Sequence, residues 1–132
     1  MRLRITFLAI AAIATGLAGC GDDNATQVPQ TLESQDTRVV DAATTAIHAY
    51  CRKVGLALAG RRDRPTADDE LRVFDAVDRL IAVAQKKPDA PYRGNSTPRD
   101  VIADAAEDLD GTNCSNALVR RLETGLAVLP QP

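Results

Sequence analysis

Residues 65–70, Pro-Thr-Ala-Asp-Asp-Glu, mark the start of the clearest helix in this sequence. Thr66 is a favourable N-cap residue, and Asp69 follows three positions later, as in a capping box. Three acids occupy the first turn and two lysines precede Pro88, so both ends complement the helix dipole. Apolar residues spaced three and four apart predict a buried stripe on this helix, formed by Leu71, Phe74, Val77, Ile81 and Ala84. Val73 and Leu80 widen this stripe.

The segment before it, from about Asp36 to Ala59, shows the same apolar spacing and predicts another helix. Gly60 is a natural stop for this helix. Three arginines follow, where cations complement the negative end of the dipole. The apolar face of this helix is expected to consist of Val40, Ala43, Ile47, Cys51, Val54 and Leu58.

Two further helices are predicted in the carboxyl-terminal part of the chain. Residues 88–96 contain two prolines and a glycine, which predicts a loop. Thr97, Pro98 and Asp100 then start a short helix, and Gly111 is expected to end it as a glycine cap. The inward-facing residues are expected to be Val101, Ile102, Ala105 and Leu109 in the third helix and Leu118, Leu122, Leu126 and Leu129 in the fourth. Since no segment alternates long enough to be a strand, the sequence predicts an all-α domain of four helices, the third short.

The first twenty residues have the layout of an export signal. Two arginines precede an apolar run that is too short to span a membrane, and small residues follow. The stretch Leu17-Ala18-Gly19-Cys20 resembles the lipobox of bacterial lipoproteins. This resemblance implies that the chain is cut before Cys20 and that its thiol receives a diacylglyceryl group. It also implies a lipid anchor on the extracytoplasmic face of the cell membrane, or of the outer membrane if the source has one.

The chain therefore divides into a signal peptide over residues 1–19, a lipidated N-terminus and tether over 20–35, and a helical domain over 36–130. Residues 21–33 are polar and show no periodicity, which predicts a coil with a root-mean-square span of about 20 Å. Removal of the signal takes away two arginines and changes the net charge from −2 to −4. This mild acidity argues against nucleic acid as a partner.

The three cysteines are expected to divide into one anchor and one bridge. Once lipid occupies Cys20, Cys51 and Cys114 remain as an even pair in an oxidising compartment. A bridge between them would stabilise this small, lean core by about 4 kcal/mol in the chain-entropy model. The competing interpretation, one reactive thiol, would need an electropositive site around it.

Side chains that carry chemistry are sparse. His48 is the only histidine, and a Cys-His nucleophile would need the thiol that the bridge consumes. The acids between Asp104 and Asp110 lack the first and twelfth ligands of a calcium loop, so we expect a solvated helix face. The sequence predicts no catalytic residue, no metal site and no cofactor, and hence a protein that is not an enzyme.

Contact with another protein is the leading functional expectation. The candidate interaction surface comprises Arg61, Arg62, Arg64, Tyr92 and Arg93, although Tyr92 could equally fold back onto the core. The predicted function is a lipid-anchored, non-enzymatic module of the cell envelope with a protein partner. The alternative is a carrier of a small molecule or lipid, which would need a cavity lined by residues such as Phe74, Leu80, Leu118 and Leu122.

Overall fold

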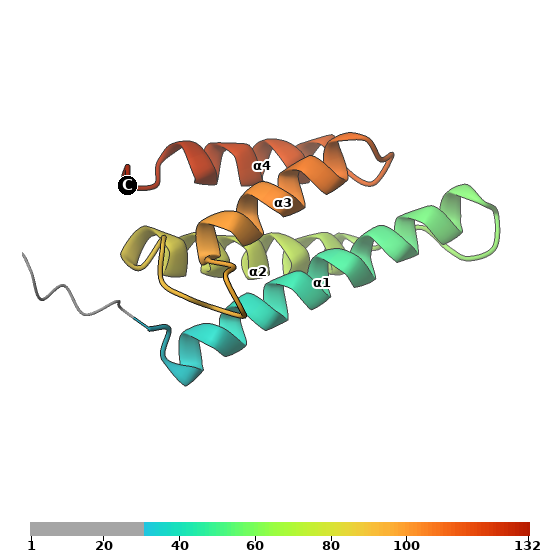
Figure 1. Cartoon of the computed structure of the whole chain (residues 1–132). Coiled ribbons are helices and arrows are strands. Elements are labelled where there is room, and N and C mark those ends of the chain that lie inside the picture. Colours follow the sequence, from blue (N-terminus) through green and yellow to red (C-terminus); the bar gives the residue numbers. More distant parts are fainter. Residues whose placement is uncertain (1–30) are drawn as a thin grey trace, which may run out of the picture.

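The computed structural model describes residues 31–132. The predicted signal peptide, Cys20 and most of the tether lie outside the described residues. The described part is all helical and comprises α1 (Ser34–Leu58), α2 (Ala67–Lys86), α3 (Pro98–Asp110) and α4 (Asn116–Ala127), as shown in Figure 1. This confirms the predicted all-α fold of four helices. α1 begins two residues earlier than expected, with Glu33 as its N-cap residue.

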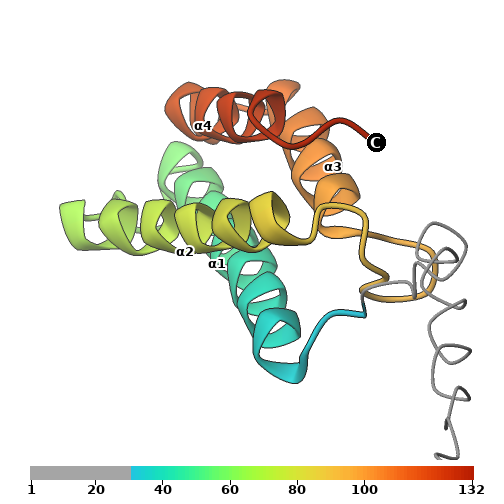
Figure 2. The same cartoon turned by 90° about the vertical axis from the view of Figure 1, so that its left-hand side faces the viewer.

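The helices form two antiparallel pairs stacked on each other. α1 packs mainly on α2, and α3 packs mainly on α4. α2 also contacts α3 and α4, and α1 crosses behind it in Figure 2. The core therefore forms around α2, whose Val73, Val77 and Leu80 are almost completely buried.

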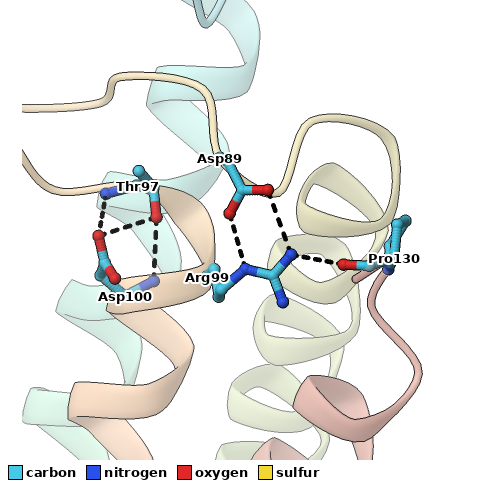
Figure 3. Close-up of polar contacts among 5 residues, drawn as sticks. All are labelled: Asp89, Thr97, Arg99, Asp100 and Pro130. Carbon is cyan, nitrogen blue, oxygen red and sulfur yellow. Dashed lines mark hydrogen bonds and ion pairs between the residues drawn. The ribbon is translucent and has the colours of Figure 1, made fainter. Parts of the chain in front are cut away.

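The N-terminal signals seen in the sequence are present as hydrogen bonds. Thr66 Oγ accepts from the Asp69 backbone N–H at 3.2 Å, and the Asp69 carboxylate accepts from the Thr66 N–H at 2.7 Å. Thr97 and Asp100 form the same capping box at the start of α3, as Figure 3 shows. Ser115 caps α4 by accepting from the backbone of Leu118 at 3.2 Å.

Two predicted core positions are wrong. Leu71 is 69% exposed and Leu58 is 66% exposed. Leu71 lies only two residues from the buried Val73, and two residues correspond to about 200° around a helix, so the two side chains face opposite sides. Leu58 is the last residue of α1, where the chain turns away toward α2.

The two predicted glycine stops differ in conformation. Gly60 has a φ of +67°, and the N–H of Arg61 donates to the Leu56 carbonyl at 2.9 Å, which is the Schellman pattern. Gly111 follows α3 but has a φ of −82°, so the expected left-handed glycine cap is wrong. There Thr112 satisfies the Leu109 carbonyl instead, through both its N–H and its hydroxyl.

The predicted disulfide is confirmed. Cys51 and Cys114 are bonded, with 5.0 Å between their Cα atoms. Cys51 lies within α1, and Cys114 lies in the connection between α3 and α4. Within the described residues α1 has no close backbone approach to α4. The disulfide therefore supplies the direct link between α1 and the start of α4.

Candidate functional site

The predicted interaction residues lie in two separate places. Arg61, Arg62 and Arg64 are exposed in the connection between α1 and α2. Tyr92 and Arg93 contact Asp41, near the other end of α1. Asp41 and Leu58 are 17 residues apart on one helix, which corresponds to about 26 Å. The five residues therefore do not form one surface.

Tyr92 holds the loop after α2 against α1. Its hydroxyl donates to Asp41, and Arg93 forms an ion pair with the same carboxylate at 2.9 Å. The hydrogen bond from Tyr92 is the main cause that lowers the pKa of Asp41, whereas burial chiefly raises the pKa of Tyr92. Tyr92 is half-buried against the core. The structure thus places this aromatic in the core-covering position that the sequence left as an alternative.

A groove that the sequence did not reveal lies between α1 and α3. Its volume is about 220 Å³ and it is open to solvent. We call it the α1–α3 groove; it is lined by Thr44, Ile47, His48, Tyr92, Val101, Asp104, Ala105, Asp108 and Leu109. Ile47 and Leu109 are buried, whereas His48, Asp104 and Asp108 are exposed. The groove therefore has an apolar floor and a polar rim.

Two features of the sequence could have indicated this groove. Val101 and Ala105 are apolar and four residues apart, so they lie on one face of the helix. Asp104 and Asp108 have the same spacing and lie on a neighbouring face. The local sequence does not connect His48 with these acids, because nothing in it indicates that α1 and α3 lie next to each other. Tertiary structure alone brings the imidazole and the carboxylates to one rim.

α3 concentrates negative charge. It contains one basic and five acidic residues and so carries a net charge of −4. Three acids, Glu107, Asp108 and Asp110, lie in or beside its last turn, which holds no basic residue. Carboxylates at the C-terminal end of a helix oppose the helix dipole and destabilise it slightly. The fold gains nothing locally from these charges.

The groups that line the groove can contact a ligand. Within residues 31–132 no three His, Cys, Asp or Glu side chains gather in an arrangement that could hold a metal ion. The sulfurs of Cys51 and Cys114 are joined to each other, so neither is available as a nucleophile. What the groove offers a ligand is an apolar floor, an imidazole and two carboxylates.

The residues that would line a carrier cavity pack elsewhere. Leu80, Leu118 and Leu122 are 0% exposed and belong to the core. Phe74 is half-buried and packs against the same core. None of the four lines the α1–α3 groove. The interior of the helical domain is therefore filled at the place where the carrier hypothesis required a cleft.

No family model, curated protein or solved structure matches this chain. None of the helices in residues 31–132 is both long enough and apolar enough to cross a bilayer. The observations that bear on function are therefore the groove, the charges and the resemblance of the first twenty residues to a lipoprotein signal.

Proposed function

We propose that this protein is a lipid-anchored helical module of the bacterial cell envelope that acts by binding another protein and catalyses no reaction. The likeness of residues 17–20 to a lipobox supports the anchor at Cys20. The disulfide between Cys51 and Cys114 fits the oxidising compartment that such an anchor implies. Within residues 31–132 no three His, Cys, Asp or Glu side chains are placed to hold a metal ion.

The size and openness of the α1–α3 groove carry this proposal. Sites for small molecules usually enclose about 300–1,000 Å³ and bury most of the ligand. The groove, at about 220 Å³ and open to solvent, is smaller. It suits one or two side chains that project from the surface of a partner, as in interfaces where a few anchoring residues enter small pockets.

A carrier of a small molecule or lipid is the second candidate. The observation in its favour is the apolar floor formed by residues such as Ile47 and Leu109. To enclose such a ligand, α1 and α3 would have to move apart, and these two helices contact each other only sparingly. The filled core around Leu80 makes this candidate the weaker one.

The position of the groove along α1 suits a partner in the envelope. The chain enters α1 at Ser34, and α1 has 25 residues, so it extends for about 37 Å. Thr44, at one end of the groove, is ten residues from this entry, or about 15 Å along the helix. The loop with Arg61 and Arg62 lies at the far end. The tether predicted from the sequence, with an expected span of about 20 Å, would leave the groove accessible from the side.

Photo-crosslinking in intact cells tests the proposal. The photoreactive residue p-benzoylphenylalanine replaces either His48, at the rim of the groove, or Arg62, in the exposed loop at the far end of α1. We expect a specific protein, identified by mass spectrometry, to be crosslinked from at least one of the two positions. If neither position captures a protein and the purified chain carries a stoichiometric lipid or metabolite, the carrier hypothesis replaces this one.

A further inference from the structure

The rim of the α1–α3 groove also indicates the chemistry of the partner. We infer that the groove receives an apolar side chain of a protein segment that carries Lys or Arg residues about one helical turn from it. This inference rests on the proposed function, since it names the kind of protein that the module binds. It follows from the geometry of the rim and from the charges that the fold leaves without partners.

The rim presents two carboxylates with a fixed separation. Asp104 and Asp108 are four residues apart on α3 and both line the groove. Residues with this spacing lie on one face of a helix, with about 6 Å between their β-carbons. Ala105 and Val101 lie beside them and continue the apolar floor. A basic amphipathic helix, with an apolar residue and a cation one turn apart, matches this pattern.

Neither rim carboxylate has a basic partner within residues 31–132. Some acids elsewhere are paired, for example Asp78 with Arg121 at 2.6 Å and Asp89 with Arg99 at 2.7 Å. Glu107 and Asp110 of α3 have no ion pair in the described part of the chain either, but they lie outside the groove. Arg93 adds little positive charge near Tyr92 because Asp41 pairs with it. The groove is therefore an apolar site with a net negative rim, and a cationic segment is its electrostatic complement.

The magnitude of the effect follows from the exposure of the rim. Ion pairs between exposed groups each contribute little to affinity, so the two carboxylates chiefly determine which partner binds, and they add only modestly to how tightly it binds. Loss of both charges is expected to weaken binding about 5- to 30-fold, which corresponds to about 1–2 kcal/mol at 1.4 kcal/mol per factor of ten. The apolar anchor supplies most of the affinity.

The test begins with the partner peptide that is crosslinked in intact cells by p-benzoylphenylalanine at position 48. The inference expects this peptide to contain an apolar residue with Lys or Arg three or four positions away. The same sequence is then synthesised, and its affinity for the full-length mature protein in detergent is measured by fluorescence anisotropy. The variant Asp104→Asn with Asp108→Asn is compared with Glu107→Gln and Asp110→Asn, which removes the same charge from α3 outside the groove.

We expect the rim variant to weaken binding about 5- to 30-fold and the matched variant to weaken it less than 3-fold. Equal weakening by both variants, or none by either, would overturn the inference. An acidic or uncharged peptide captured at His48 would also overturn it. If a protein is crosslinked from the photoreactive residue at position 62 but not from the one at position 48, the inference is contradicted and the proposed function is not. Capture from neither position would refute the proposed function itself.

Discussion

Gly125 of α4 lies so close to Ile81 of α2 that a β-carbon on Gly125 would stand 2.6 Å from Cγ1 of Ile81, nearer than carbon atoms pack. The two helices therefore meet at this point without room for any larger residue. Ile81 is itself buried, so its branched end cannot turn out into solvent. A larger residue at position 125 would therefore have to displace Ile81 or move the two helices apart.

Replacement of Gly125 by alanine is expected to lower the free energy of unfolding by about 1–3 kcal/mol, because overpacking displaces Ile81. The matched control is Gly55→Ala in α1, where a new β-carbon meets nothing within 4 Å. The control should stabilise the protein by about 0.5–1 kcal/mol through helix propensity. Urea unfolding midpoints measure both effects, and a stabilising Gly125→Ala would contradict the close packing.

The disulfide is expected to be a major source of stability. Joint replacement of Cys51 and Cys114 by alanine opens a loop with a sequence separation of 63 residues. The chain-entropy model gives a loss of about 4 kcal/mol, and for a domain of this size Tm should fall by at least about 15 °C. Thermal unfolding with and without a reducing agent measures the same quantity. If the reduced protein melts at the temperature of the oxidised one, the bridge does not stabilise the fold.

The lowered pKa of Asp69 predicts how the free energy of unfolding depends on pH. The hydrogen bond from Lys53, followed by those from Thr66, holds the pKa of Asp69 at about 2, below the ordinary 3.8. Because the folded pKa is the lower one, this stabilisation is present above about pH 4 and is lost as the pH falls toward 2. Asp69→Asn should therefore give a shallower loss of stability between these values. Asp68→Asn, one residue earlier, should keep the original slope in urea unfolding; equal slopes for both variants would contradict the assignment.

Arg99, near the start of α3, links the loop before α3 to the segment after α4 through hydrogen bonds. Its guanidinium makes two hydrogen bonds to Asp89, at 2.7 and 3.2 Å, and a third to the Pro130 carbonyl (Figure 3). A lysine cannot reproduce this planar fork, so Arg99→Lys should lower the stability of the protein. Hydrogen exchange at Leu129 should become faster. Arg120→Lys is the control, because Arg120 contacts only a carbonyl of its own helix; exchange equally fast in both variants would contradict this link.

Features that depend on a few neighbouring residues could be predicted from the sequence. Thr66 with Asp69 and Thr97 with Asp100 form capping boxes whose partners are three residues apart. The cysteine pairing was also predictable, because once lipid is assigned to Cys20 only one pairing remains. In each case local geometry or simple counting restricts the alternatives to one.

Features that depend on how helices meet could not be predicted. Leu71 fits the apolar spacing of α2, yet it is exposed because the partners of α2 lie on the side of Val73. The α1–α3 groove brings His48 to the same rim as Asp104, although the two residues are 56 positions apart. Spacing along one helix gives the width of its apolar face, but the packing of other helices decides which part is covered.

The division of the three cysteines into one anchor and one bridge is the basis of the proposed envelope function, and mass spectrometry of the protein isolated from its own cells tests it most directly. The predicted mass is that of a chain that begins at Cys20 and carries a diacylglyceryl group. No thiol should be alkylated before reduction, and two should be alkylated after it. A chain that retains residues 1–19, or that exposes an alkylatable Cys20, would contradict the lipid anchor and with it the proposed location.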